Sequence, residues 1–141
     1  MVYLDTSVLV ALCVREPKSA AVTAWYAACR EDLGCSVWCV TEFASALGIK
    51  QCTAQITSEQ AASAWQAFER LCASDLHLLP IDPSTFYRAA ELTLDADSGL
   101  RAGDALHLAV ALDAKIKHMA TLDETLARNA MRMKVKPLGF D

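Results

Sequence analysis

Short apolar runs alternate with longer segments of helical periodicity along this chain. The runs that are typical of buried strands are residues 1–4, 35–38, 77–79, 118–121 and 134–136. Apolar residues at helical spacing fill the intervals, at residues 8–14, 18–30, 41–50, 57–72, 83–96, 104–117 and 124–130. Strands that alternate with helices in this way are typical of a parallel sheet covered by helices on both faces. The pattern therefore predicts an α/β protein with a central parallel sheet of about five strands flanked by helices.

The length and composition of the chain agree with one folded unit. Its 141 residues fit a single domain, which we expect to span residues 1–141. Hydrophobic residues make up 54% of the chain, which is enough for a core and excludes a disordered protein. The net charge of −4, from 13 basic and 17 acidic side chains, excludes a simple basic module that binds nucleic acid.

The charge is unevenly distributed along the chain. Residues 31–97 hold ten acidic and three basic side chains. Residues 128–136 hold no acidic side chain and four basic ones, namely Arg128, Arg132, Lys134 and Lys136. The sequence leaves two interpretations of this basic segment open: a rim that attracts RNA toward an acidic protein, and an ordinary solvated surface.

The chain has six cysteines, which could form disulfides or a metal site: Cys13, Cys29, Cys35, Cys39, Cys52 and Cys72. The sequence contains no C-x-x-C, and its three histidines lie far from any pair of cysteines, so we do not expect a structural zinc site. Several of the cysteines lie in apolar or helix-like patterns, which favours free thiols over a disulfide framework.

The sequence shows no targeting or membrane-spanning segment. Its apolar start lacks a basic region and is interrupted by Asp5, unlike a signal peptide. No apolar stretch approaches the roughly 20 residues that a membrane span needs. We therefore expect a soluble, reduced and cytoplasmic protein.

Four acidic residues follow predicted strands or begin the next helices: Asp5, Glu42, Asp104 and Asp123. Any one of them alone is best explained as a helix cap or as a charge that suits the helix dipole. Ligands of open parallel sheets, however, bind at the carboxyl ends of the strands, where these side chains would meet. Carboxylates in one small volume repel one another unless a cation neutralises them, and oxygen ligands suit Mg²⁺ or Mn²⁺. The set therefore predicts a divalent-metal site.

Carboxylate-bound metal ions are typical of nucleases and phosphatases, because the ion activates water and stabilises charge on a phosphoryl oxygen. The sequence lacks G-x-x-x-x-G-K-[ST] and G-x-G-x-x-G, so the usual motifs for nucleoside triphosphates and dinucleotides are missing. It also lacks the G-x-S-x-G motif of serine hydrolases. The residues therefore favour metal-dependent hydrolysis of a phosphate ester.

Four blocks of the sequence resemble the PIN-domain ribonucleases. They are Met-Val-Tyr-Leu-Asp-Thr-Ser-Val-Leu-Val at residues 1–10, Thr-Glu-Phe at 41–43, Arg-Ala-Gly-Asp-Ala-Leu-His-Leu-Ala at 101–109 and Thr-Leu-Asp-Glu-Thr-Leu at 121–126. The order and spacing of the blocks agree with that family over essentially the whole chain. The similarity is greatest to the VapC-type toxins of bacterial toxin–antitoxin pairs. The resemblance implies a single PIN-like nuclease domain.

The resemblance also implies an endoribonuclease that depends on Mg²⁺ or Mn²⁺ and cuts RNA phosphodiester bonds with metal-activated water. Asp5 and Asp104 would be the main metal ligands, and Glu42 would bind the metal directly or through water. Asp123 would complete the acidic pocket, and Thr6 would steady Asp5.

The partners that the resemblance implies are RNA as substrate, a cognate antitoxin and a second copy of the chain in a homodimer. The antitoxin would place a segment across the active site. It would also supply the DNA binding, so we expect DNA contact only through the antitoxin, and we expect no membrane partner.

Two residues of the block around Asp104 have further candidate roles. Arg101 is a candidate for contact with an RNA phosphate. His107 lies three residues after Asp104 and therefore on the same helical face, where it could line the site or contact RNA. For His107 we favour a second interpretation, a histidine packed inside an apolar helix.

Two other function classes remain as alternatives. One is a catalytically silent PIN-like module that binds RNA or a protein, although such a module has no need to keep all four acidic residues. The other is a receiver domain that accepts a phosphoryl group. A receiver domain is expected to have an acidic pair after its first strand, whereas Asp5 is followed here by Thr6 and Ser7.

Overall fold

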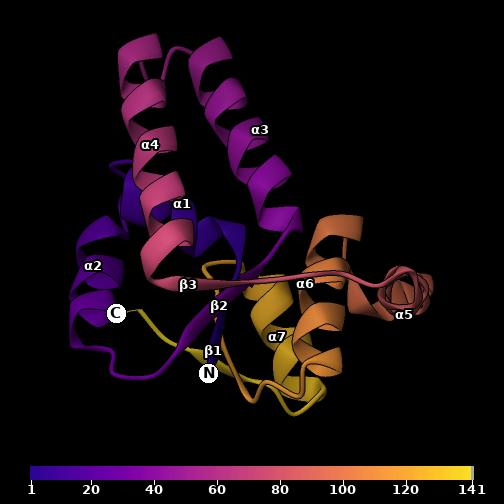
Figure 1. Cartoon of the computed structure of the whole chain (residues 1–141). Coiled ribbons are helices and arrows are strands. Elements are labelled where there is room, and N and C mark those ends of the chain that lie inside the picture. Colours follow the sequence, from indigo (N-terminus) through magenta and orange to yellow (C-terminus); the bar gives the residue numbers. More distant parts are fainter. Residues whose placement is uncertain (141) are drawn as a thin grey trace.

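A five-stranded parallel sheet forms the centre of the protein (Figure 1). The computed structural model describes residues 1–140. The strands are β1 (Val2–Leu4), β2 (Leu33–Ser36), β3 (Leu76–Leu79), β4 (His118–Ala120) and β5 (Lys136–Leu138). Their order is β3-β2-β1-β4-β5, and every neighbouring pair is parallel. The predicted α/β class with a parallel sheet of five strands is confirmed.

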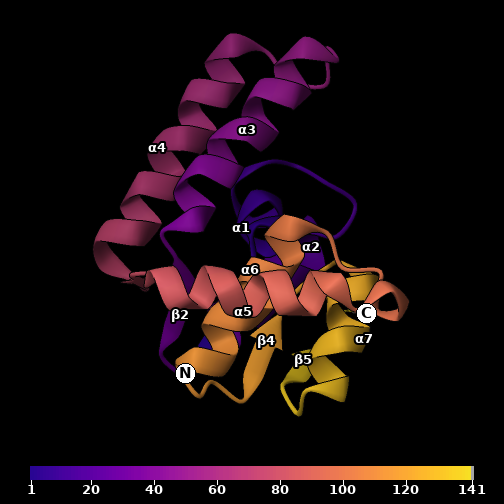
Figure 2. The ribbon, with the colours of Figure 1, turned by 90° about the vertical axis from the view of Figure 1, so that its right-hand side faces the viewer.

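Helices fill the intervals between the strands. They are α1 (Thr6–Cys13), α2 (Ser19–Ala28), α3 (Trp38–Cys52), α4 (Ser58–Ser74), α5 (Pro83–Leu94), the short 3-10 helix η1 (Ala96–Ser98), α6 (Ala102–Asp113) and α7 (Glu124–Arg132). Helices α3 and α4 lie side by side as a hairpin that extends away from the sheet (Figures 1 and 2). Helices α5 and α6 pack against each other, with α5 in front of α6 in Figure 2.

The strand order excludes a receiver domain and brings two acidic segments together. Receiver domains have the flavodoxin-like order 2-1-3-4-5. In this protein β2 separates β1 from β3, and β1 pairs with β4. Asp5 follows β1 and Asp123 follows β4. The two residues are therefore neighbours at the carboxyl end of the sheet, although the chain between them includes most of the protein.

The sheet separates two apolar clusters, and β1 contributes to both. Val2 and Leu4 pack into the cluster that is covered by α1 to α4. Tyr3 packs into the other cluster, which is covered by α5 to α7. This division follows from the strand geometry, because successive side chains of a strand point to opposite faces. Tyr3 is thus turned toward α6, in which residues 105–111 are all buried.

Two of the candidate acids also act as helix caps. The Oδ1 atom of Asp5 accepts the backbone N–H of the third residue beyond it at 3.2 Å, where α1 begins. Asp123 does the same at the start of α7, at 2.7 Å. The cap interpretation is therefore correct for these two residues, and each cap occupies one carboxylate oxygen.

The second strand and the helix after it begin earlier than the sequence pattern predicts. The sequence suggests a break at Gly34, but this residue pairs inside β2, which begins at Leu33 rather than at residue 35. Helix α3 begins at Trp38 rather than at residue 41. Glu42 consequently lies in the second turn of α3, one turn inside the helix and not at its start.

The last strand begins later than predicted. Residues 134–136 have the apolar and basic pattern of a strand, but Lys134 has a φ of 63°, which is incompatible with a strand. Lys134 belongs to the turn that closes α7, and its backbone N–H donates to the carbonyl of Met131 at 3.0 Å. The strand therefore starts only at Lys136.

The six cysteines are free thiols, as predicted. Among the helices of residues 1–140, none has both the length and the apolar character that crossing a membrane would require.

Candidate active site

The loops that follow β1 and β4 are joined by hydrogen bonds around Asp5. The hydroxyl of Thr121 donates to Oδ2 of Asp5 at 2.5 Å and accepts the backbone N–H of Asp123 at 3.0 Å. The hydroxyl of Ser7 donates to Oδ1 of Asp5 at 2.6 Å and accepts the backbone N–H of Leu122 at 2.9 Å. Two hydroxyl groups therefore fix the position of Asp5 relative to the loop that contains Asp123.

Asp5 is almost completely buried. Only 3% of its surface is exposed. Burial raises the pKa of its carboxyl group above the ordinary value, although the nearby His107 and the hydrogen bonds from Ser7 and Thr121 act in the opposite direction. The donors around both oxygens therefore fix the carboxyl group of Asp5 in place.

Glu42 extends from α3 into the same region and is held by three donors. Its Oε1 atom accepts hydrogen bonds from the hydroxyl of Thr6 and from Nε2 of His107, the latter at 2.6 Å. Its Oε2 atom accepts the indole N–H of Trp38 at 3.1 Å. Burial alone would raise the pKa of Glu42, but His107 and the other donors hold it below its ordinary value. Glu42 is therefore ionised in the neutral range.

Thr6 has a different partner from the one predicted. The resemblance implies that Thr6 steadies Asp5 through its hydroxyl or its backbone, and the structure shows that the hydroxyl donates to Glu42 instead. The oxygens of Asp5 are already engaged by Ser7 and Thr121. Thr6 is the first residue of α1 and lies 3.4 Å from Nε2 of His107, so its side chain points toward α6 instead.

His107 is a buried residue of α6, as the favoured interpretation predicted, and only 1% of its surface is exposed. The sequence did not indicate its contact with Glu42. Its other ring nitrogen, Nδ1, lies 2.7 Å from the hydroxyl of Tyr3. Burial alone would lower the pKa of His107, but Tyr3 and Glu42 help to hold it well above its ordinary value.

Asp104 lies in the first turn of α6, and the charges of the other three acids affect its pKa. Partial burial raises the pKa of its carboxyl group to about 6, and the negative charge of Asp123 is the next largest cause. The charges of Asp5 and Glu42 raise it further, whereas His107 opposes the shift. The other three predicted acids therefore lie close enough to Asp104 to raise the pKa of its carboxyl group.

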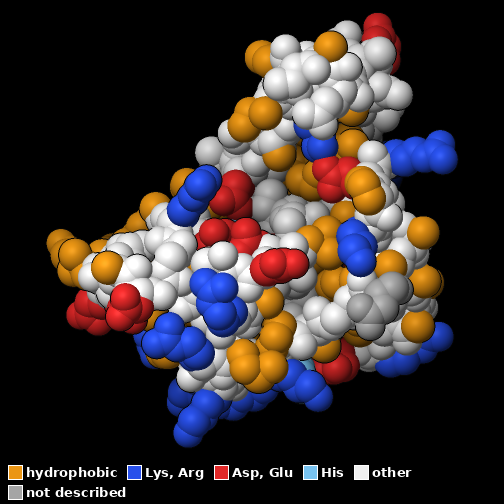
Figure 3. Space-filling view, turned by 180° about the vertical axis from the view of Figure 1, so that it is seen from behind, with side chains coloured by type: hydrophobic (Ala, Val, Ile, Leu, Met, Phe, Trp, Pro, Cys, Tyr) orange, Lys and Arg blue, Asp and Glu red, His pale blue; other side chains and the backbone are white. Residues whose placement is uncertain are grey.

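Three of the four acids line one open pocket of about 690 Å³: Glu42, Asp104 and Asp123. Its wall also contains Trp38, Gly99, Arg101, Gly103 and Thr125. On the face shown in Figure 3, acidic side chains gather around a central hollow, and Lys and Arg side chains lie around them. An anionic substrate would need a positive charge between itself and such carboxylates.

The carboxylates do not form a ready-made metal cage. In the part of the chain that the structure describes, no three acidic, histidine or cysteine side chains form a group that could hold a metal ion with their present positions. Asp5 and Glu42 instead direct oxygens at protein donors.

Residues 2–131 match the sequence model of the PIN domain. The chain belongs to the PIN domain family. This finding confirms the resemblance that the four sequence blocks suggested. No curated protein sequence matches this PIN domain.

Solved structures share the fold of this PIN domain over nearly its whole length. VapC20 from Mycobacterium tuberculosis, a toxin that cleaves the sarcin–ricin loop, has a TM-score of 0.75 and 18% identity, and the match covers 92% of this chain and 95% of VapC20. FitAcB from Neisseria gonorrhoeae has a TM-score of 0.72 and 21% identity, with 99% and 97% covered. VapBC2 from Rickettsia felis, solved with a DNA fragment from its promoter, has a TM-score of 0.67 and 14% identity, with both chains fully covered at 100%. At these identities the similarity shows the fold alone.

Sequence reasoning missed several residues that hold the acids of this PIN domain. Ser7 and Thr121 hold Asp5, and Trp38 holds Glu42. One signal was available for the first two, because each hydroxyl residue lies within two positions of an acidic one in the sequence. No such signal was available for Trp38, because the sequence predicts a strand at residues 35–38, whereas α3 begins at Trp38 and places it on the same helical face as Glu42.

Arg101 occupies the N-cap position of α6 and is exposed on the pocket wall. A second basic side chain, Arg128 of α7, reaches toward Gly99 on the same wall. Both arginines are therefore close to the acidic pocket, and contact between Arg101 and an RNA phosphate stays a prediction.

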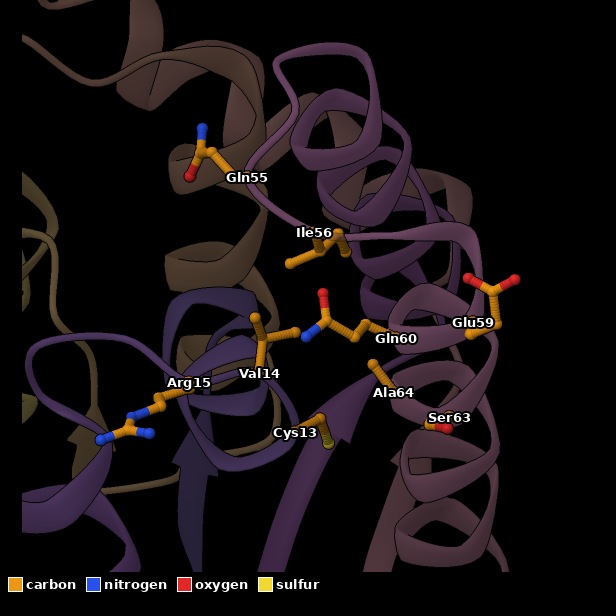
Figure 4. Close-up of a pocket in the computed structure, with 9 residues that line it drawn as sticks. All are labelled: Cys13, Val14, Arg15, Gln55, Ile56, Glu59, Gln60, Ser63 and Ala64. Atoms are coloured by element: carbon orange, nitrogen blue, oxygen red, sulfur yellow. The ribbon is translucent and has the colours of Figure 1, made fainter.

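A separate pocket of about 550 Å³ lies between the end of α1 and the turn of the α3–α4 hairpin (Figure 4). None of the four acidic candidates lines it. Its side chains include Arg15, Gln55 and Gln60, and the pocket has no cluster of acidic groups. The acidic candidates Glu42, Asp104 and Asp123 line the other pocket, the one of about 690 Å³.

Proposed function

We propose that this PIN domain is a divalent-metal-dependent endoribonuclease and the toxin of a bacterial type II toxin–antitoxin pair. One observation carries the proposal: in a PIN-family chain, Glu42, Asp104 and Asp123 from three separate segments line one open pocket, and the charges of the other acids add to the effect of burial in raising the pKa of Asp104. Such mutual repulsion lowers stability, so a chain that maintains it has a use for a cation at this place.

The donor set fits Mg²⁺ or Mn²⁺, because all four candidates supply carboxylate oxygens, which these hard cations prefer. Asp5 and Asp104 would be the main ligands of the ion. Asp123 would complete the pocket, and Glu42 would act on the ion directly or through water. When bound, the ion would lower the pKa of a water molecule and stabilise charge on a phosphoryl oxygen.

Glu42 is suited to orient the attacking water. Two donors occupy its Oε1 atom, whereas Oε2 accepts one hydrogen bond from Trp38 and lies beside Gly103 on the pocket wall. Because the carboxylate is ionised, a free electron pair of Oε2 can accept a proton of that water. Attack of the water oxygen on the phosphorus atom would break the bond between phosphorus and the 3′ oxygen and leave a 5′-phosphate. The departing oxygen would take a proton from solvent and become the 3′-hydroxyl.

Arg101 and Arg128 are suited to bind the RNA backbone beside the acidic pocket. Both side chains are exposed, and both lie at the wall that contains the acids. Their positive charge would attract the polyanion to a protein whose net charge is −4.

The partners of this PIN domain would be RNA, a cognate antitoxin and a second copy of the chain. VapBC2, which has a related fold, was solved bound to a DNA fragment from its promoter, and this supports a DNA-bound assembly for a chain of this fold. We propose that DNA binding comes from the antitoxin and that the chain itself binds only RNA and protein.

Cleavage of cellular RNA by the purified chain tests the proposal. We expect cleavage with Mg²⁺ or Mn²⁺ that stops when a chelator is added. Asp5→Asn and Asp104→Asn should abolish cleavage and leave the circular dichroism spectrum unchanged. Wild-type cleavage rates in either variant would mean that the site is assigned incorrectly.

A catalytically silent module that binds RNA or protein is the other outcome. In that case the folded chain would cut no RNA, and calorimetric titration would detect no Mn²⁺ binding. Mn²⁺ binding without cleavage would instead point to a substrate that is missing from the assay.

A further inference from the structure

A buried row of side chains connects the sheet to the candidate active site. It runs from Ser36 of β2 through Tyr3 of β1 and His107 of α6 to Glu42 of α3. The hydroxyl of Tyr3 donates to Ser36 at 3.1 Å, and it lies 2.7 Å from Nδ1 of His107. Nε2 of His107 lies 2.6 Å from Oε1 of Glu42.

We propose that His107 is a positioning residue that fixes the carboxylate of Glu42 in the acidic pocket. The consequence for RNA cleavage rests on the proposed function, whereas the orientation of Glu42 can be tested without it.

The position of His107 in α6 makes this role possible. It lies one turn after Asp104, so the same helical face supplies one acid of the site and the group that holds another. The ring is itself fixed, because it is fully enclosed and packs edge-on against the ring of Tyr3, with centroids 5.7 Å apart. Because the ring is already fixed, His107 loses little conformational entropy when it holds the flexible side chain of Glu42.

The hydrogen bonds allow one orientation of the carboxylate. A carboxylate only accepts hydrogen bonds, so Nε2 of His107 must carry a proton. Thr6 shares Oε1 with His107, and Trp38 donates to Oε2. Rotation of the carboxylate away from this position would leave the buried N–H of His107 without its acceptor, which is costly.

The close packing of Gly103 agrees with a fixed carboxylate. A Cβ atom at this position would lie 2.6 Å from Oε2 of Glu42 and 3.4 Å from the indole nitrogen of Trp38. Helix α6 therefore approaches Glu42 with its backbone at Gly103 and with a hydrogen-bond donor at His107.

Two substitutions distinguish the roles of the two ring nitrogens of His107. His107→Gln places a side-chain N–H near the position of Nε2, whereas His107→Asn places its amide near the position of Nδ1. For His107→Asn we expect about a 10–100-fold loss of Mn²⁺ affinity and of RNA cleavage, the usual effect of losing the group that orients a metal ligand. For His107→Gln we expect a much smaller loss. A purely structural role through Tyr3 would give the opposite order.

The indole N–H of Trp38 reports the position of Glu42 in the metal-free protein, because it donates to Oε2. In ¹H–¹⁵N spectra we expect His107→Asn to shift this signal and His107→Gln to leave it close to the wild-type position. The indoles of Trp25 and Trp65 are internal references, since both lie in the other apolar cluster. Equal shifts in both variants, or no shift in either, would overturn the proposal.

A double-mutant comparison gives an independent answer. If His107 acts through Glu42, His107→Asn should cause no further loss of Mn²⁺ affinity in a Glu42→Ala background. A full additional loss there would overturn the proposal. If His107→Asn fails to fold, a comparison of the wild type with Glu42→Gln replaces this test. The ¹⁵N resonance of His107 Nε2 must then shift when the carboxylate of Glu42 is replaced by an amide, and an unchanged resonance would overturn the proposal.

The two hypotheses fail separately. A wild-type protein that binds no Mn²⁺ and cuts no RNA overturns the proposed function, while the Trp38 and Nε2 signals still decide whether His107 positions Glu42. Normal cleavage by His107→Asn, with an unshifted Trp38 signal, overturns the positioning role alone.

Discussion

The hydroxyl of Thr121 lies 2.5 Å from Oδ2 of Asp5, and this contact joins two loops that are 116 positions apart in the chain. The two residues follow β4 and β1, which are neighbours in the sheet. The same hydroxyl accepts the backbone N–H of Asp123. Thr121 therefore sets the spacing of two candidate metal ligands.

Thr121→Val should lower both stability and activity. The substitution keeps the shape of the side chain but leaves the buried Asp5 without one donor, which we expect to cost about 1–3 kcal/mol in the free energy of unfolding. Urea denaturation at neutral pH measures this cost. The matched control is Thr23→Val on the exposed side of α2, which should change the free energy by less than about 0.5 kcal/mol. Equal effects of the two substitutions would mean that the Thr121 hydrogen bond contributes nothing.

Gly103→Ala should lower the rate of RNA cleavage without lowering the stability of the folded protein. The added Cβ would collide with Oε2 of Glu42, so we expect the carboxylate to move and RNA cleavage to fall by about 100-fold. The helix itself should tolerate alanine, which favours helices by about 1 kcal/mol over glycine.

Gly48→Ala is the control for Gly103→Ala. Gly48 lies inside α3, and a Cβ there would meet no atom within 4 Å. This variant should be more stable than the wild type and cut RNA at the wild-type rate. A Gly103→Ala protein that behaves in the same way would contradict the close approach of α6 to Glu42.

The raised pKa of Asp104 predicts how stability depends on pH. In the folded chain this pKa is about 6, above the ordinary value of 3.8. The folded state therefore binds more protons than the unfolded state between these values, so stability is highest below the lower value and falls as the pH rises through 6. Because Asp104 is only half-buried, we expect the loss to be about 1 kcal/mol.

Asp104→Asn isolates the contribution of this group. The variant should lack this part of the pH dependence, so its stability relative to the wild type should increase between pH 4 and pH 6. Thermal unfolding of both proteins across this range measures the difference. A constant difference would mean that Asp104 titrates normally.

Arg101→Gln should weaken RNA binding more than it slows the chemical step. If Arg101 contacts a phosphate, KM should rise, and the slope of log K against log salt should fall by about 0.7 for a single strand. Arg30→Gln, at an exposed site beyond the end of α2, provides the control and should change neither quantity. An unchanged salt slope in Arg101→Gln would show that its guanidinium does not bind phosphate.

Local patterns were enough to predict the strands and the helices, and they indicated four acidic residues as candidates for the site. The apolar alternation and the positions of Asp5 and Asp123 after strands depend on residues that are close in sequence, and so do the helix caps that these two acids form. The four sequence blocks likewise predicted the PIN family. Boundaries were less accurate at Gly34 and Lys134, where the pairing of β2 and a left-handed turn overrode the local pattern.

Local sequence patterns therefore predicted the fold class, the family and four acidic candidates, whereas long-range packing sets which donors hold those acids. Thr6 binds Glu42 rather than Asp5, and His107 links Glu42 to Tyr3. These contacts join residues that are 36 to 104 positions apart. Periodicity and capping act over one or two turns, but such partners depend on the strand order and on the face to which each strand turns its side chains.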